Sequence, residues 1–457
     1  MKTTERSADL VVIGGGIAGL AAAWTAGDHG CDTVLLEKSD RFGGSVLTHR
    51  SEGYRVEGGP HTLLVNEQGV EDFLRNTGLW DRAIDSQDLA SKRFIVRRGK
   101  PVALPSGPLD FLTRPFLSPW AKGRLILEPL LHGKGPEGEE AIGPWVGRHF
   151  GREVQHGLAD PFVSGIYAGD PDRISVQSAF PKLAAIADLH PSLFRAFLKH
   201  GREMKASGKH RYPRRMMSFP DGLGEMVEHL VESGKFDPLS GVQIDSIHST
   251  SAGWTVNVRL GSNSDAIALT AKRLVVAVPP SALHRLPFAE GIRERLSLFS
   301  EVESPPVTTF SLAFKRKDVK HPLDGFGMLC PQRENREALG ILFDSSLFPG
   351  RAPDDEVLLS VFLGGIRSPE KARLSTEELL QVAVKECREL LGATGAPTFW
   401  KSTFWPRAIP QYNLGYARKI EILSQIENTE TGLTFAGNAR DGVALGSCIL
   451  SGVTRSQ

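Results

Sequence analysis

Cysteine is scarce in this chain, and neither sign of charge is in excess. The four cysteines among 457 residues stand far apart, at positions 31, 330, 387 and 448, and no two form a Cys-x-x-Cys pair. This usage argues against a disulfide framework and a cysteine-based metal site, and it indicates a reducing compartment. The formal net charge is +1 and no dense basic run occurs, so the sequence predicts no nucleic-acid partner.

Long apolar runs are missing as well. No stretch of about 20 apolar residues lacks both charges and glycines, so we expect no membrane-spanning helix. Residues 10–27 are uncharged, but their glycines and the preceding acids Glu5 and Asp9 argue against a signal sequence or transit peptide. The sequence predicts a cytoplasmic protein. Its 40% apolar and 23% charged residues suggest two or three globular domains at this length.

A nucleotide-binding pattern begins near the N-terminus. Leu10–Ile13 is typical of a buried parallel strand, and Ala18–Ala26 has the composition of a helix. Between the strand and the body of the helix lie Gly14, Gly16 and Gly19, at the spacing Gly-x-Gly-x-x-Gly. The first glycine permits a tight turn, the second lets a pyrophosphate approach the backbone, and the third lets the helix pack against the strand. The helix N-terminus offers unpaired N–H groups to the phosphates.

A second strand indicates which dinucleotide is bound. Thr33–Leu36 is apolar and ends at Glu37, whose carboxylate suits ribose hydroxyls and disfavours a 2′-phosphate. Arg41, Gly43 and Gly44 follow, in a run that resembles glucose–methanol and amine-oxidase-like flavoproteins, where this glycine pair lies under the pyrophosphate. At the far end of the chain, another short strand, a turn and a helix start fit a second approach to a flavin. The sequence therefore predicts FAD rather than NAD.

The predicted fold class is α/β, with a Rossmann-like FAD-binding domain, a strand-rich α+β substrate domain and an inserted helical domain. The cofactor domain is interrupted, because strand patterns return after residue 213 whereas no run of strands follows Val96 before that point. The expected domains comprise 1–88, 213–290 and 414–457 for FAD, 89–212 for the helices, and 291–413 for the substrate.

The helical segment contains an unusual stretch at residues 109–131. It is rich in Leu, Phe, Pro and Trp, and it reads as short helices broken by proline, at Pro115, Pro119 and Pro129. Basic residues are interspersed at Arg114, Lys122 and Arg124. A compact apolar helix set with basic residues fits an element lying on a membrane surface, and ordinary core helices fit equally well.

Several blocks of the chain match one family. From residue 9 to 452 the chain resembles the oxygen-dependent, FAD-containing protoporphyrinogen oxidases of the flavin amine oxidase superfamily. The matching blocks are EGGPHTLL (57–64), KRFIVRRGKPVALPS (92–106), DPFVSGIYAGDPDRIS (160–175), SFPDGLGEM (218–226), KHPLDGFGMLCP (320–331), ILFDSSLFPGRAP (341–353), VFLGG (361–365), WPRAIPQYNLGY (405–416) and GNARDGVALGSC (437–448).

The resemblance implies six-electron oxidation of protoporphyrinogen IX to protoporphyrin IX by non-covalent FAD, with O2 as acceptor and H2O2 as product. The resemblance leaves three further interactions open: peripheral contact with the cytoplasmic face of the inner membrane, formation of a homodimer, and contact with ferrochelatase. Relatives often continue helically past Gly452, so a shortened last helix is expected. Besides the glycines, Glu37 and Arg41, the expected cofactor residues are Gly59, Val242, Trp405, Gly437, Val443 and Leu445.

The substrate residues follow from strand alternation and from the resemblance together. In RFIVRR, Phe94, Val96 and Arg98 should share one face and Arg97 the other, so only one arginine of the pair points into a slot. The family's propionate-binding arginine corresponds to Arg97, and a guanidinium suits a carboxylate bidentately. The residues that sandwich the macrocycle correspond to Leu329, Leu342 and Phe362.

A glycine-bearing loop near the flavin corresponds to residues 165–170, with Gly169 at the substrate edge. This chain has Ala168 where some relatives have glycine. The flavin carries the hydride transfer, so we expect no catalytic general acid or base. We interpret His61 as a structural or supporting residue and Cys448 as packing.

Other functions remain open at this point. A coproporphyrinogen III oxidase would need more pocket cations for a four-carboxylate substrate. Another flavin oxidase, acting on amines or carotenoid precursors, would share the first and last blocks. A flavin-binding partner protein of the haem pathway would need no catalytic site.

Overall fold

The strand formed by the first apolar run lies in the middle of a seven-stranded sheet. The structure is a computed structural model that describes residues 4–107, 110–111, 116–131, 138–207, 212–261 and 266–456. In the first sheet β10-β2-β1-β13 pair in parallel, β12 and β11 extend it antiparallel, and β19 pairs in parallel with β13. Its strands are β1 (Thr4–Ile13), β2 (Thr33–Leu36), β10 (Asp237–Leu239), β11 (Val242–Thr250), β12 (Gly253–Leu260), β13 (Ala266–Val276) and β19 (Leu433–Phe435).

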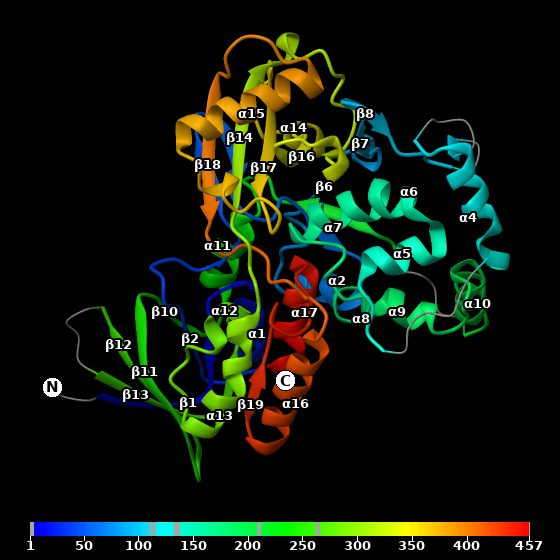
Figure 1. Ribbon diagram of the computed structural model, residues 1–457. Helices are drawn as coiled ribbons and strands as arrows, with labels where there is room; N and C mark the ends of the chain where they lie inside the picture. Colours follow the sequence, from blue (N-terminus) through cyan, green and yellow to red (C-terminus); the bar gives the residue numbers. More distant parts are fainter. Residues whose placement is uncertain are drawn as a thin grey trace.

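Helices from both ends of the chain cover this sheet. Helix α1 (Ile17–Asp28) is buried along almost its whole length, because its alanines present a small surface on every side. Helix α17 (Leu445–Arg455) packs against it so closely that a methyl group on Gly452 would lie 2.1 Å from the carbonyl oxygen of Ala18. The predicted cofactor domain thus unites segments more than 400 residues apart, as the blue and red ribbons show in Figure 1.

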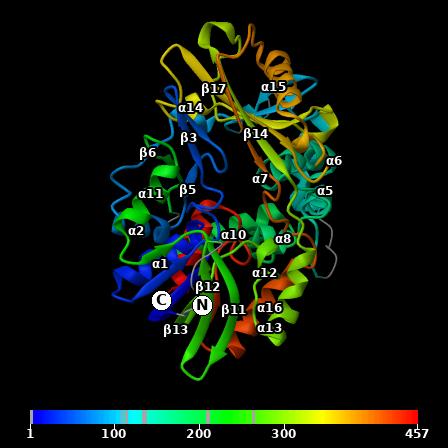
Figure 2. The same ribbon diagram turned by 90° about the vertical axis from the view of Figure 1, so that its left-hand side faces the viewer.

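A second seven-stranded sheet lies above the first in both views (Figures 1 and 2). Its order is β18-β14-β17-β16-β15-β7-β8. The face that holds Phe310, Ile341 and Val361 packs against α15 (Thr376–Leu391) in an apolar core. The strands are β7 (Phe94–Arg97), β8 (Lys100–Ala103), β14 (Val307–Lys315), β15 (Gly327–Leu329), β16 (Ala338–Leu342), β17 (Glu356–Gly364) and β18 (Phe399–Trp405).

Strands β7 and β8 correct the expected boundary of the helical segment. Phe94 and Ile95 pair with β15 in parallel, and residues 94–97 pair with β8 antiparallel, so residues 94–103 belong to the second sheet. Sequence reasoning assigned them to the helical segment because their pairing partner lies more than 200 residues further along the chain. The segment 89–212 therefore begins as part of the second sheet.

The rest of that segment is helical and lies to the right in Figure 1. The expectation that Pro129 breaks a helix is wrong, because α4 continues through it to Leu131. Pro119 begins α4, where the missing N–H of proline costs nothing. Arg114 and Pro115 lie outside the described residues. The helices are α4 (Pro119–Leu131), α5 (Ile142–Phe150), α6 (Arg152–Val154), a π-helical turn (Gln155–Ala159), α7 (Asp160–Tyr167), α8 (Val176–Ala179), α9 (Pro181–Ala187) and α10 (Leu193–Ala206).

Smaller elements join the two sheets. A hairpin and a three-stranded sheet lie between them, built from β3 (Thr48–Ser51), β4 (Tyr54–Glu57), β5 (Leu63–Val65), β6 (Ile84–Asp85) and β9 (Arg215–Ser218). The remaining helices are α2 (Gln68–Asn76), α11 (Gly224–Ser233), α12 (Pro280–Leu283), α13 (Glu290–Leu296), α14 (Asp344–Leu347) and α16 (Tyr416–Thr429). Within the described part of the chain, no helix combines the length and apolar character needed to cross a bilayer.

Candidate active site

The turn between β1 and α1 has the geometry that its glycines predict. Gly14 has a φ of +108°, which L side chains rarely adopt, and a methyl group there would lie 2.7 Å from the carbonyl oxygen of Ala277. A methyl group on Gly19 would lie 1.8 Å from the carbonyl oxygen of Gly14, so the helix can approach the strand only with glycine at this position. A methyl group on Gly16 would meet no protein atom within 4 Å.

That open space lies at the N-terminus of α1. Gly16 is the N-cap and provides no side-chain cap, so the first N–H groups of the helix have no side-chain acceptor at this residue. A pyrophosphate would satisfy these donors and would also meet the positive end of the helix dipole. Free donors beside an open space therefore fit an adenine dinucleotide.

Glu37 lies beside this turn, at the end of β2. One oxygen of its carboxylate accepts the backbone N–H of Gly15 at 2.7 Å, and the other accepts that of Ser39 at 2.8 Å. Its carbonyl oxygen accepts the N–H of Val242 at 2.9 Å. The two predicted cofactor residues Glu37 and Val242 are thus adjacent, and the remaining lone pairs of the carboxylate suit ribose hydroxyls.

The second glycine pair folds over the first turn. A methyl group on Gly44 would lie 3.1 Å from the Cα atom of Gly16, and Gly43 forms a bridge with Gly16 at a φ of +102°. Arg41 holds this loop, because its guanidinium donates to the carbonyl oxygen of Gly44 at 2.6 Å. Part of the donor capacity of Arg41 is therefore used by the loop itself.

The C-terminal cofactor residues reach the same place. The N–H of Gly437 donates to Ser451 Oγ at 2.7 Å, and a methyl group on Gly437 would lie 3.0 Å from Ala18 Cβ on α1. Leu445 is the first residue of α17, and Val443 is half-buried just before it.

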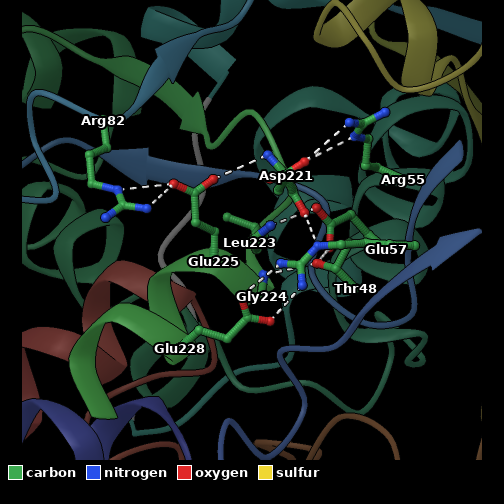
Figure 3. Close-up of polar contacts among 10 residues, drawn as sticks. Thr48, Arg55, Glu57, Arg82, Asp221, Leu223, Gly224, Glu225 and Glu228 are labelled. Atoms are coloured by element: carbon green, nitrogen blue, oxygen red, sulfur yellow. Dashed lines mark hydrogen bonds and ion pairs between the residues drawn. The ribbon is translucent and has the colours of Figure 1, made fainter. Parts of the chain in front are cut away.

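Gly59 and Trp405 approach from the junction of the two sheets. Trp405 donates its indole N–H to the carbonyl oxygen of Gly58 at 2.6 Å. A methyl group on Gly59 would lie 2.0 Å from the carbonyl oxygen of Ser45. The strand β4 that leads into these glycines is fixed by polar contacts with α11, as Figure 3 shows.

The key residue of that contact is Glu57. Its carboxylate accepts the N–H of Leu223 at 2.8 Å and the hydroxyl of Thr48 at 2.6 Å, while Thr48 Oγ1 accepts the N–H of Gly224 at 2.8 Å (Figure 3). These bonds cap the first turn of α11, whose own N-cap residue provides no side-chain cap. Burial raises the pKa of Glu57 above its usual value, although the guanidinium of Arg351 and the hydrogen bonds act in the opposite direction.

The face of the second sheet opposite α15 carries the predicted substrate residues. Leu329 pairs with Gly340 and Gly340 pairs with Phe362, so the three residues stand side by side on one face. Leu342 lies two residues beyond Gly340 and therefore on the same face. Leu329, Leu342 and Phe362 are half-buried, although most of their strand neighbours are buried. Strand register thus brings the three predicted wall residues together.

Arg97 lies on that face at the end of β7. Ile95 pairs with Leu329, and Arg97 follows two residues later, so the two residues share a face. The Nη2 atom of Arg97 lies 3.0 Å from Glu153 Oε1, and its buried Nη1 atom has no hydrogen-bond partner among the described residues. Arg98 is exposed in the β7–β8 turn, with a φ of +53°. Glu153 was not predicted, since nothing in its neighbouring sequence signals an arginine partner.

Helix α7 faces the wall residues. A methyl group on Gly165 would lie 2.5 Å from Leu329 Cδ2, and one on Gly169 would lie 2.3 Å from Gln411 Oε1. Ala168 adopts a left-handed conformation with a φ of +48°, and its carbonyl oxygen accepts the N–H of Ile366 at 2.8 Å. The loop is therefore held against the sheet without a glycine at position 168.

A buried histidine–carboxylate pair adjoins the wall. His61 Nδ1 lies 2.7 Å from Asp344 Oδ1, and the ring centroids of His61 and Phe362 are 5.3 Å apart, edge to face. Sequence reasoning noted His61 and missed Asp344, because the two lie 283 positions apart. Cys448 is buried near the C-terminal flavin segment, and burial raises the pKa of its thiol to about 12, which disfavours the reactive thiolate.

Comparison with known proteins places this arrangement in a family. The family model described as flavin containing amine oxidoreductase matches residues 17–457. The chain is 31% identical to the mitochondrial protoporphyrinogen oxidase of Nicotiana tabacum, over 97% of this chain and 93% of the relative. The chain belongs to the flavin-containing amine oxidoreductase family. It is therefore an FAD-dependent oxidoreductase, and the predicted relationship to protoporphyrinogen oxidases is confirmed.

Two further comparisons concern a solved structure with a similar fold and a second class of relatives. A structure from Exiguobacterium sp., named as a candidate protoporphyrinogen oxidase, matches with a TM-score of 0.79 at 24% identity over 100% of this chain and 98% of that one. This likeness confirms the predicted fold class. The coproporphyrinogen III oxidase of Bacillus subtilis is 24% identical over 97% of this chain and 96% of its own length.

Proposed function

We propose that this oxidoreductase converts protoporphyrinogen IX to protoporphyrin IX, with O2 as the electron acceptor and H2O2 as the product. The observation that carries the proposal is the face formed by Leu329, Leu342 and Phe362, which ends at the partly unpartnered guanidinium of Arg97. A wide apolar wall with a cation at one end suits a macrocycle whose carboxylates are on one side. Arg97 would bind one propionate through Nη1 while Glu153 holds Nη2.

The residues of the chain orient the substrate and exclude water. The bound FAD supplies the acceptor for hydride from a meso carbon. Gly14, Gly16, Gly19, Glu37 and the 41–44 loop would hold its pyrophosphate and ribose without a covalent bond. The apolar wall would place the meso carbon, and helix α7, whose Gly165 lies against Leu329, would bound the slot on the opposite side.

A substrate comparison tests the proposal. The purified protein is mixed with protoporphyrinogen IX and, separately, with coproporphyrinogen III, and porphyrin fluorescence and H2O2 are followed. We expect faster oxidation of protoporphyrinogen IX, because its vinyl groups suit the apolar wall better than two additional carboxylates do. Faster oxidation of coproporphyrinogen III would overturn the assignment, and oxidation of neither porphyrinogen would overturn the function.

We propose as well that the helical part contacts the cytoplasmic face of a membrane. Large apolar side chains are exposed on two helices that touch each other, α4 and α10: Trp120 (90% exposed), Ile126, Leu127 and Leu130 on α4, and Phe194, Phe197 and Leu198 on α10. Basic residues Arg195, Lys199 and Arg202 lie on α10 beside them, which suits anionic lipid headgroups. A hollow of about 610 Å³, lined by Trp120, Leu127 and Glu153, connects this patch with the partner of Arg97.

Liposome flotation tests this contact. Wild-type protein should float with vesicles that contain anionic lipid, and the double substitution W120S/L130S should reduce the bound fraction several-fold, because it removes exposed apolar area. Equal flotation of the two proteins would exclude the patch. The three-domain division also remains part of the proposal, supported by the strand and helix patterns of the sequence, with residues 94–103 moved to the second sheet. A homodimer and ferrochelatase contact are supported by the resemblance alone.

A further inference from the structure

The pair formed by His61 and Asp344 lies between the glycine turn after β4 and the start of α14. His61 follows Gly58 and Gly59, the turn that Trp405 holds through the carbonyl oxygen of Gly58. Asp344 follows Leu342 by two residues, at the start of α14. The pair therefore joins the predicted flavin segment to the wall of the predicted substrate slot.

Each residue of the pair has a second polar atom that does not take part in the hydrogen bond between them. Both residues are buried, at 7% and 6% exposed. His61 Nε2 and Asp344 Oδ2 are buried atoms without a hydrogen-bond partner among the described residues. A buried polar atom left unpartnered costs free energy unless a ligand or a water satisfies it. A ligand or a water beside the pair would satisfy these atoms.

The carboxylate selects the tautomer of the imidazole. The ionised carboxylate of Asp344 can only accept a hydrogen bond, so Nδ1–H donates to it at 2.7 Å and the neutral ring carries its free lone pair on Nε2. Other charged groups nearby are Glu57, which interacts electrostatically with His61, and Arg351, which interacts with Asp344 and lies 3.7 Å from Glu57.

We propose that His61, oriented by Asp344, accepts the proton that the porphyrinogen loses in each two-electron oxidation. The inference rests on the proposed function. Each of the three steps breaks one meso C–H bond, whose hydrogen and electron pair leave as hydride with the flavin, and releases one proton, which moves to Nε2 directly or through one water. Two of the three protons come from pyrrole N–H bonds and the third comes from the remaining meso carbon, so that four meso hydrogens and two N–H hydrogens are lost in all. Reduction of O2 to H2O2 consumes the hydride together with this proton, so the imidazole returns to its neutral form.

The chain offers a matched control for this pair. His149 Nδ1 lies 3.1 Å from Glu128 Oε1, and both residues are buried in the helical part. This second histidine–carboxylate pair has the same chemistry and burial but lies away from the wall residues. The substitution His149→Asn should therefore leave flavin reduction unchanged.

The test compares His61→Asn, Asp344→Asn and His149→Asn with the wild-type holoenzyme. Each protein is mixed anaerobically with protoporphyrinogen IX, and the loss of flavin absorbance is followed. We expect reduction to slow about 100-fold in His61→Asn and about 10-fold in Asp344→Asn, within the range of general-base catalysis. Bound flavin and the dissociation constant for protoporphyrin IX should match those of the wild type. Wild-type reduction rates in His61→Asn with full flavin would overturn the proposal.

A second measurement does not depend on activity. In holoenzyme labelled with 15N-histidine, the His61 signals, assigned by their loss in His61→Asn, should show an unprotonated Nε2 and a protonated Nδ1. A protonated Nε2 in the neutral ring would overturn the proposal even where a variant loses its flavin. Failure of the wild type to oxidise any porphyrinogen would instead overturn the proposed function.

Discussion

The cofactor end and the substrate end of this molecule are built in different ways. At the cofactor end, backbone geometry makes the site, and a methyl group on Gly19 would come within 1.8 Å of the Gly14 carbonyl oxygen. At the proposed substrate end, side chains would make the site, and strand register brings together Leu329 and Phe362 through Gly340. The first region tolerates almost no change of shape, whereas the second should tolerate changes of side chain that alter specificity.

The largest effect should come from the glycines of the first region. Gly19→Ala should prevent stable folding of the cofactor domain, because the added methyl group overlaps a backbone oxygen. Gly16→Ala should fold normally, since no protein atom lies within 4 Å of the new methyl group, but its FAD affinity should fall about 100-fold because the methyl group occupies the pyrophosphate space. Thermal unfolding and flavin titration check both, and Gly123→Ala, which also meets no protein atom, is the control.

The second-largest effect should be at Phe362. Because this side chain is half-buried, Phe362→Ala should keep the fold and the flavin content. Turnover of protoporphyrinogen should fall by about 10- to 100-fold, since a loosened wall misplaces the meso carbon. Stopped-flow kinetics with flavin quantification measure both quantities. Normal turnover in the variant would show that Phe362 is not part of the slot.

Substitutions of Arg97 and Arg98 test which arginine of the second region contacts the substrate. Arg97→Ala should raise the KM for protoporphyrinogen about 10- to 100-fold, the loss of a charge-assisted contact of about 1.5–3 kcal/mol. Arg98→Ala should have little effect, because Arg98 is exposed in the β7–β8 turn. Steady-state kinetics of both variants measure the change in KM. A larger effect at Arg98 would place the propionate outside the predicted face.

The smallest effect should be the pH dependence of stability caused by Glu57. Its pKa is raised in the folded state by burial, so the folded protein keeps this proton at pH values where the unfolded chain has lost it. Stability should therefore decrease as pH rises above about 4.5 and through the raised value, by at most about 1.4 kcal/mol per pH unit. Glu57→Gln should flatten this slope in thermal unfolding between pH 5 and 8, whereas Glu228→Gln, at the exposed edge of the same contact, should not.

The spacing of residues along the chain was sufficient to predict the nucleotide-binding part of the site. The β1–α1 turn, Glu37 and the 41–44 loop lie within 35 positions of each other, so their relation follows from short-range geometry. Helix boundaries in the apolar segment 109–131 were harder to predict from the sequence, and Pro129 does not end α4 as expected. Neighbouring turns and packing can satisfy the backbone group that a proline frees, and no local pattern reveals this.

Strand alternation does not place Arg98 as expected, because β7 ends at Arg97 and Arg98 lies in the turn that follows. By itself, the sequence determined the nucleotide turn, the identity of the cofactor and the family. These depend on residues close together along the chain or on recognisable blocks. Only the tertiary structure decided that β7 and β8 join the second sheet, that Glu153 pairs with Arg97, and that Asp344 contacts His61. The physical reason is sequence distance: a pairing register or a buried ion pair between remote segments depends on the packing of the whole chain, and neither partner carries a local signal of the other.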